Sequence, residues 1–185
     1  MLSAIRSTAL LLALIGIASC SSAAETEVAL TRHQDKSYEI SGLFTVDAST
    51  SAVWAVLTDY EHIPGFVSSM RSSHIRESRR DGSLLVEQVA VGDMFFLTKK
   101  MHVLLEVRLG PERLRFTDVG HDGFRTYDGD WEVRPITLGS GVSYHLLVEP
   151  SFLAPSFILS RAMKKGARKL LDQVRAEIVR RELAR

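Results

Sequence analysis

The stretch VWAVLTDYEHIPGF, residues 53–66, interrupts a chain that otherwise reads mainly as strands, and it decides how that chain must fold. Val53 and Val56 lie on one face of a predicted helix of only two or three turns. Such a short helix is marginal by itself and needs packing against the rest of the protein. Pro64 disfavours the α conformation at Ile63, so we expect the helix to end in an aromatic elbow.

Runs of alternating apolar and polar residues on both sides of this elbow predict β-strands. A first strand covers 38–46, and Asp81–Gly82 is a strong hairpin signal. The other predicted strands are 70–80, 83–91, 94–109, 114–119, 124–135 and 142–149. Because short turns join consecutive strands, we expect a curved antiparallel sheet of six to seven strands.

A long amphipathic helix is predicted over 156–183. Its apolar stripe recurs at i, i+4 spacing, while the opposite side is rich in Lys and Arg. The stripe consists of Ile158, Ala162, Gly166, Leu170, Val174 and Ile178, and Leu159, Met163 and Leu171 widen it. A sheet followed by one such helix predicts an α+β fold in which the helix lies across the curved sheet.

The length of 185 residues favours a single domain, and 45% hydrophobic residues is typical of a folded one. Net charge is +1, although 156–185 alone carries nine Lys or Arg against three Asp or Glu. So small a net charge, with no aromatic residues interleaved among the basic ones, argues against a nucleic-acid partner. The basic helix face is either a solvated surface or a surface for anionic lipid headgroups.

The first twenty residues are typical of an export signal. Arg6 precedes the uncharged apolar run 9–18, which is too short to span a bilayer. Two processing sites compete. Ser22–Ala24 fits cleavage before Glu25, whereas Ile17–Cys20 resembles a bacterial lipobox that would make Cys20 a lipidated N-terminus.

We therefore divide the chain into a signal peptide at 1–20, a flexible tether at 21–36 and one folded domain at 37–185. The expected location is the bacterial periplasm, with possible anchoring through Cys20. This is the only cysteine, so the mature domain is expected to contain no disulfide.

Three segments resemble the START-like, helix-grip superfamily, and within it the polyketide cyclase/dehydrase and coenzyme Q-binding branch. They are VWAVLTDYEHIPGFVSSMRSS at 53–73, YDGDWEVRP at 127–135 and VSYHLLVEPSFLAPSFI at 142–158. The resemblance extends from about Tyr38 to Leu183. It implies a deep apolar cavity between the sheet and the C-terminal helix, of the kind in which family members hold lipids, quinones or polyketides.

The resemblance also implies which residues meet the ligand. The elbow would form one lip of the cavity and the loop 151–155 the facing lip. Simple core packing, or anchoring of the helix start, is the alternative for several of these residues. The predicted set is Tyr60, Pro64, Phe66, Met70, Phe95, Met101, Val103, Trp131, Tyr144, Leu146, Phe152, Leu153, Met163, Gly166 and Leu170.

No catalytic motif is present: the chain has no G-x-S-x-G, H-E-x-x-H, P-loop or dinucleotide fingerprint. His102, Glu106, Tyr144 and His145 are the acid–base candidates if the cavity performs cyclisation or dehydration. The histidines show no ligand-like clustering, so neither a metal nor another cofactor is expected.

The favoured hypothesis is an exported or membrane-anchored carrier, chaperone or sensor of a hydrophobic small molecule such as a lipid, a quinone or a polyketide-like compound. An enzyme that uses the same cavity is the alternative. A third possibility is an interaction domain with a filled core and an active basic helix face.

Overall fold

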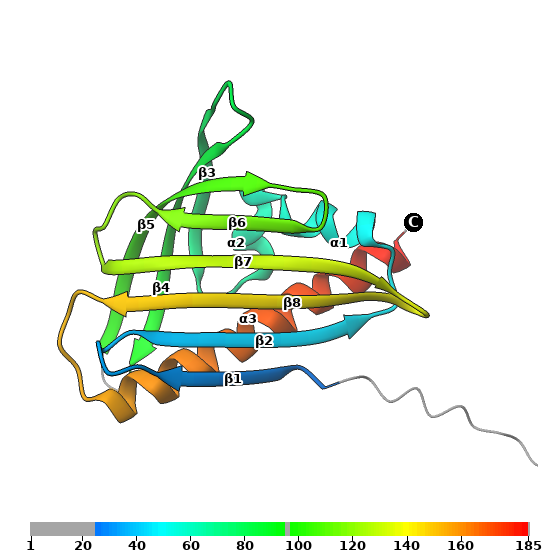
Figure 1. The fold of residues 1–185 in the computed structure, drawn as a ribbon. Helices are drawn as coiled ribbons and strands as arrows, with labels where there is room; N and C mark the ends of the chain where they lie inside the picture. The colour runs from blue at the N-terminus through cyan, green and yellow to red at the C-terminus, as the bar shows by residue number, and fades with distance from the viewer. Residues whose placement is uncertain (1–24, 95–96, 185) are drawn as a thin grey trace, which may run out of the picture.

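The computed structural model describes residues 25–94 and 97–184 (Figure 1). Within this range the chain forms eight strands, three α-helices and one 3-10 turn. In chain order they are β1 (Glu27–Arg32), β2 (Tyr38–Val46), α1 (Thr50–Leu57), the 3-10 turn η1 (Tyr60–His62), α2 (Ile63–Phe66), β3 (Met70–Ser78), β4 (Leu84–Met94), β5 (Leu97–Leu109), β6 (Arg113–Asp118), β7 (Phe124–Ile136), β8 (Gly139–Pro150) and α3 (Ser156–Leu183).

All strands join one antiparallel sheet in the order β1-β2-β8-β7-β6-β5-β4-β3. The described part of the sheet therefore has eight strands. The prediction of six to seven strands is wrong because it omits the edge strand β1. This strand lies inside the predicted tether at 21–36. Thr26 and Val28 are buried while Glu27 and Ala29 are exposed, so the segment alternates as a half-buried strand does.

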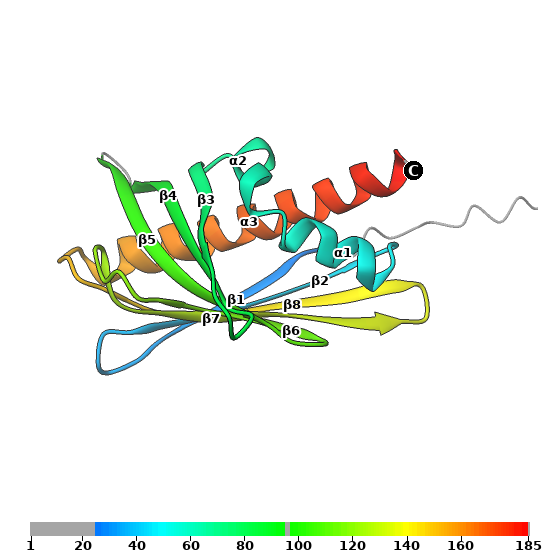
Figure 2. The same ribbon diagram turned by 90° about the horizontal axis from the view of Figure 1, so that it is seen from above.

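Helix α3 lies across one face of the sheet, and the strands β3, β4 and β5 curl up beside it (Figure 2). The bounds of α3 agree with the sequence-based prediction, but its buried face is rotated from the predicted stripe. Leu159, Ala167, Leu171, Val174 and Ile178 are buried against the sheet.

Gly166 is exposed, and a Cβ at this position would meet nothing within 4 Å. The prediction that it lies on the buried stripe and lines a cavity is therefore wrong. The close approach of helix and sheet is made instead by Gly42 of β2, where a Cβ would collide with the side chain of Leu171. A glycine on the sheet can admit a large helix residue without the loss of helix propensity that Gly166 brings.

The elbow after α1 is present, although its cause differs from the predicted one. Ser49 caps α1 by accepting a hydrogen bond from the Ala52 amide at 3.2 Å. Thr58 ends the helix by donating its hydroxyl to the Trp54 carbonyl at 2.7 Å. The break falls near Asp59, because Ile63 is helical and Pro64 occupies the first turn of α2, where proline needs no amide partner.

Candidate functional site

An apolar cavity of about 120 Å³ lies where the elbow, the inner face of the sheet and α3 meet. Its lining combines side chains from α1, η1, α2, six strands and α3. The lining residues are Val56, Leu57, Tyr60, Ile63, Phe66, Val67, Met70, Gln88, Leu105, Val107, Leu114, Phe116, Tyr127, Trp131, Tyr144, Leu170 and Val174. The predicted location between sheet and helix is thus where the structure has its apolar hollow.

Aromatic rings form a continuous row along this cavity. The ring centroids of Phe124 and Tyr127 are 4.9 Å apart, and those of Tyr127 and Phe116 are 5.9 Å apart. Tyr144 continues the row at 6.4 Å from Phe116 and 4.6 Å from Trp131. Offset and tilted ring pairs at these separations stabilise one another. The row gives the cavity a stiff, flat-sided wall.

Tyr60, Tyr127 and Tyr144 bring hydroxyl groups into this apolar lining. Burial raises the pKa of Tyr60 and of Tyr127 to about 12, and it raises that of Tyr144 well above its ordinary value. The phenols of Tyr127 and Tyr144 lie close enough together for each to influence the pKa of the other. All three phenols are neutral at pH 7, so they can donate hydrogen bonds to a guest molecule but cannot act as bases.

Six of the predicted ligand-binding residues line the cavity: Tyr60, Phe66, Met70, Trp131, Tyr144 and Leu170. Five others pack in or against the core outside the cavity: Met101, Val103, Leu146, Phe152 and Met163. Pro64 is half-buried on the elbow without lining the cavity. Phe95 and the predicted lipidation site Cys20 lie outside the described residues.

Leu153 is 96% exposed, and the loop 151–155 contributes no lining residue. The prediction that Leu153 and Phe152 form a second lip facing the elbow is therefore wrong. Phe152 packs against the core, as its alternative interpretation allowed. Of the two predicted lip segments, only the elbow contributes residues to the cavity lining.

The residues that sequence reasoning missed come mostly from the strands. Tyr127 has the same parity as Trp131 on β7, and Gln88 has the same parity as Val86 on β4, so alternation alone could have placed both inside. Which of the many inward residues meet at one hollow depends on the curvature of the sheet. Gln88 donates a hydrogen bond to the buried hydroxyl of Ser73 at 3.1 Å.

The elbow is attached to the C-terminal part of α3 by polar contacts. Arg181 lies 2.8 Å from the carboxylate of Asp59, and its guanidinium sits 5.7 Å from the ring centroid of Phe66. Glu177 holds this guanidinium from the other side at 2.7 Å. Phe66, which lines the cavity, is thus stacked against a guanidinium that also binds Asp59 in the preceding turn.

Three of the four acid–base candidates lie on the outer face of the sheet, away from the cavity. His102 contacts Asp122 at 2.7 Å and Glu87 at 2.9 Å, and the hydrogen bond to Glu87 is the main reason that its pKa is raised. His145 contacts Glu39 at 3.0 Å. Glu106 pairs with Arg79 and Arg108, and the hydrogen bond from Arg108 chiefly lowers its pKa. Only Tyr144 faces the cavity.

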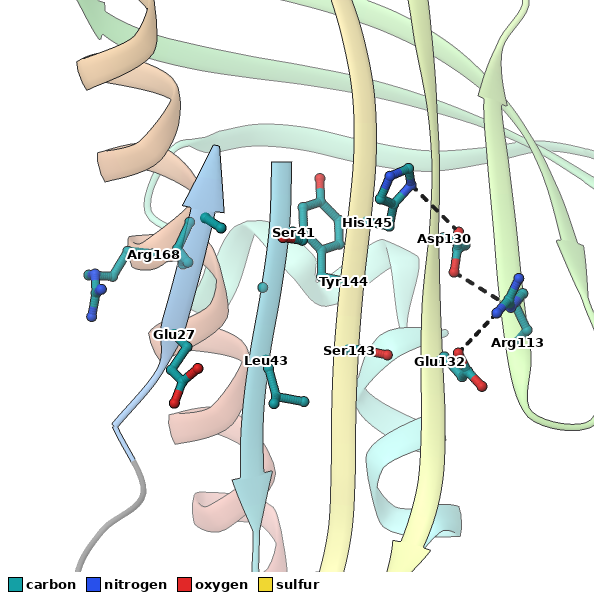
Figure 3. A pocket seen from close by; sticks show the side chains of 13 residues that line it. Glu27, Ser41, Leu43, Arg113, Asp130, Glu132, Ser143, Tyr144, His145 and Arg168 are labelled. Carbon is teal, nitrogen blue, oxygen red and sulfur yellow. Dashed lines mark hydrogen bonds and ion pairs between the residues drawn. The ribbon is translucent and has the colours of Figure 1, made fainter. Parts of the chain in front are cut away.

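A second hollow lies on the outer face, across β1, β2, β8, β7 and β6 (Figure 3). It is an open depression of about 910 Å³ whose lining mixes charged and apolar residues. Arg113 lies 2.9 Å from Glu132 and 3.6 Å from Asp130, and His145 lies 3.9 Å from Asp130. Because these charges already pair with one another, the depression offers little to an apolar guest.

Among the described residues, no group of three or more His, Cys, Asp or Glu side chains is arranged to hold a metal ion. No helix in the described ranges is long and apolar enough to cross a bilayer, since α3 is rich in charge.

An eight-stranded antiparallel sheet curved round a C-terminal helix, with an apolar hollow between them, defines the START-like, helix-grip class. A family model described as polyketide cyclase / dehydrase and lipid transport matches residues 46–175. The chain belongs to this family, which confirms the resemblance seen in the sequence.

Solved structures with the same fold share little sequence with this chain. Human StAR-related lipid transfer protein 5 matches with a TM-score of 0.69 at 10% identity, over 85% of this chain and 84% of its own. The Zhui aromatase/cyclase from Streptomyces sp. R1128 matches with a TM-score of 0.65 at 13% identity, over 78% of this chain and 95% of its own. A START superfamily protein from Mycobacterium smegmatis matches with a TM-score of 0.66 at 14% identity, over 77% of this chain and 97% of its own. No curated protein matches the chain in sequence.

Proposed function

We propose that this protein binds one hydrophobic small molecule between the inner face of the sheet and α3, as a carrier, chaperone or sensor. The observation that carries the proposal is the cavity at this place, whose lining is apolar and aromatic apart from Gln88 and three neutral tyrosines. Binding then rests on apolar burial, with a few hydroxyls orienting the guest. Family membership supports the same class of ligand.

The volume of the cavity indicates that the structure is a closed form. Pockets for small molecules usually have volumes of about 300–1,000 Å³, whereas this cavity has about 120 Å³. The elbow is the element that can make room, because Ile63 and Phe66 line the cavity and are only partly buried. We propose that a guest enters by displacing this elbow from α3.

The paired phenols favour a guest that carries an oxygen acceptor. Tyr127 and Tyr144 both line the cavity, and a carbonyl or hydroxyl oxygen of a guest could accept a hydrogen bond from either hydroxyl. A quinone, a polyketide-like compound and a lipid with a polar end all meet this requirement. The flat aromatic wall suits ring systems.

We also propose that the protein is exported to the periplasm and anchored to a membrane through a lipid on Cys20. The support is the apolar run and the lipobox-like residues before it. Cys20 precedes Glu25 by five residues, which reach at most about 18 Å when extended. Glu25 itself lies 3.4 Å from Arg168 on α3, so an anchor would hold this helix near the bilayer. Cys20→Ala should release the protein from membranes, whereas an unmodified mature N-terminus at Glu25 in mass spectrometry would exclude lipidation.

Native mass spectrometry of the purified protein, followed by extraction of any co-purified molecule, tests the binding proposal. Val174 on α3 lines the cavity and is 4% exposed, so Val174→Phe should fill the hollow and remove the bound mass. The matched control is Val179→Phe on the same helix, because Val179 is 40% exposed and should leave binding unchanged. Equal binding by both variants would contradict this location.

A cyclase or dehydrase remains the second candidate, because the family includes such enzymes by its description. The described lining supplies no carboxylate or histidine as a base, so Tyr60, Tyr127 and Tyr144 are the acids that such an enzyme would use. Turnover of an aromatic polyketide substrate that is lost in Tyr144→Phe would favour this candidate over simple binding.

A further inference from the structure

The end of the molecule where α3 begins has an unusual surface. Leu153 is 96% exposed and Phe157 is 70% exposed, so neither side chain is buried in the hydrophobic core. Exposed large apolar side chains are ordinary when scattered, but these two lie within one turn of the start of one helix. They are followed by exposed basic residues rather than by a mixed surface.

The basic residues lie on the same side of α3 as Phe157. Arg161, Lys164 and Lys165 follow it by four, seven and eight positions, and the helical repeat brings such positions to one face. All three are exposed, and none has an ion pair within the described residues. We call Leu153, Phe157, Arg161, Lys164 and Lys165 the docking face.

The charge on this part of the helix is of one sign. Residues 156–171 contain five Lys or Arg and no Asp or Glu, and the first acidic residue of α3 is Asp172. Lys100 near the start of β5 is also exposed. Strand β5 starts at the end of the molecule where α3 begins (Figures 1 and 2). A solvated helix would normally mix both signs, as the later turns of α3 do.

We infer that the docking face binds an anionic lipid bilayer. Apolar side chains flanked by lysine and arginine on one helix face match the interface of such a bilayer, where the apolar groups enter the headgroup layer and the cations meet lipid phosphates. A protein partner would need a larger continuous apolar area than two side chains provide. This inference deepens the membrane association proposed above, but it stands on the fold alone and needs no bound ligand.

Docking by this face orients the molecule. Helix α3 forms one wall of the cavity, so a bilayer at the docking face lies beside the element that separates the cavity from the outside. Leu138, which is 79% exposed, sits at the opposite end of β8 and should stay in water (Figure 1). Leu153 and Leu138 make a matched pair, since both are highly exposed leucines but they lie at opposite ends of the molecule.

A fluorescence experiment on the full chain can separate the two ends. The chain has one cysteine, so Cys20→Ser gives a background without thiols into which Leu153→Cys or Leu138→Cys is introduced. Each is labelled with the environment-sensitive dye NBD and mixed with phosphatidylglycerol-rich or pure phosphatidylcholine vesicles. We expect emission at 153 to rise and shift to the blue with phosphatidylglycerol only, while emission at 138 stays unchanged.

Charge reversal supplies the second arm. In the chain labelled at 153, we expect the double variant Lys164→Glu and Lys165→Glu to raise the lipid concentration at half-maximal fluorescence by about tenfold or more. Arg71→Glu with Arg80→Glu is the control, because both arginines are exposed on the β3 side and the change in charge is identical. The control should shift the curve far less.

Several outcomes would overturn the inference. They are no response at 153, an equal response at 153 and 138, an equal response to both vesicle types, and an equal loss in both charge-reversed chains. Because vesicles without added ligand are used throughout, failure here leaves the cavity-binding proposal standing. Conversely, the absence of a bound molecule in the native mass spectra would contradict the cavity-binding proposal and leave the docking result intact.

Discussion

Arg181 near the end of α3 reaches back to Asp59 at the start of the elbow, and the closest nitrogen and oxygen are 2.8 Å apart. The two residues are far apart in sequence, yet this pair and the stacking of Arg181 on Phe66 attach the elbow to α3 beside the cavity. Burial would raise the pKa of Asp59, but hydrogen bonds from His62 and Arg181 lower it below its ordinary value. The carboxylate is therefore charged at neutral pH and keeps the contact.

Arg181→Met should loosen the elbow. Loss of the ion pair and of the ring contact should cost about 2 kcal/mol of unfolding free energy, since hydrogen bonds to charged groups contribute about that much. Hydrogen exchange at the amides of residues 60–67 should accelerate more than exchange in β8. Arg180→Met is the control, because Arg180 also binds Glu177 but contacts no residue of the elbow. Equal acceleration in both variants would show that the elbow is held by other contacts.

Stability should fall in acid through Glu177. The hydrogen bond from Arg180 is the largest reason that the pKa of this 8% exposed carboxylate falls from 4.5 to about 2. Because the pKa is depressed in the folded state, the stabilisation is complete above pH 4.5 and is lost as the pH falls towards 2. Urea unfolding in this window should show a contribution of up to about 3 kcal/mol that Glu177→Gln removes. Asp172→Asn, an exposed site on the same helix without an ion pair among the described residues, should leave the pH profile unchanged.

Gly166→Ala should stabilise the protein. The position is an exposed helix interior where a Cβ meets nothing within 4 Å, so about 1 kcal/mol of helix propensity is gained. Gly129→Ala should do the opposite, because a Cβ there would collide with the carbonyl of His145 and the ring of Phe116. We expect it to cost about 1–3 kcal/mol. Thermal unfolding of the two variants would show opposite shifts in Tm, and a lower Tm for Gly166→Ala would refute the assignment of that face to solvent.

Tyr144→Phe and Tyr127→Phe should weaken binding of oxygen-bearing guests selectively. A naphthoquinone and methylnaphthalene make a useful pair of probes, since only the quinone accepts a hydrogen bond from a phenol. We expect roughly tenfold weaker binding of the quinone and little change for the hydrocarbon, because one hydrogen bond is lost. Titration followed by tryptophan fluorescence measures both, with Trp131 in the cavity wall. An equal loss for both probes would mean that the hydroxyls shape the cavity rather than orient the guest.

Much of the architecture could be predicted from local patterns. The bounds of α3 follow from the proline before it and the length of its amphipathic period, and the Asp81–Gly82 turn is found with Gly82 at a φ of 83°. Strand β1 was missed because only six residues alternate before the pattern ends at Arg32. Such a short segment is held by pairing with β2 and not by its own propensity.

Apart from β1, the chain's own sequence determined the elements and their order, because hydrophobic periodicity, turn residues and caps act over a few neighbouring positions. Only the tertiary structure decided which inward side chains share a cavity, that Gly42 rather than Gly166 admits the helix, and that Leu153 faces solvent. Those outcomes depend on how far the sheet curves and on how α3 is rotated about its axis. Both are set by the packing of side chains that lie tens of residues apart.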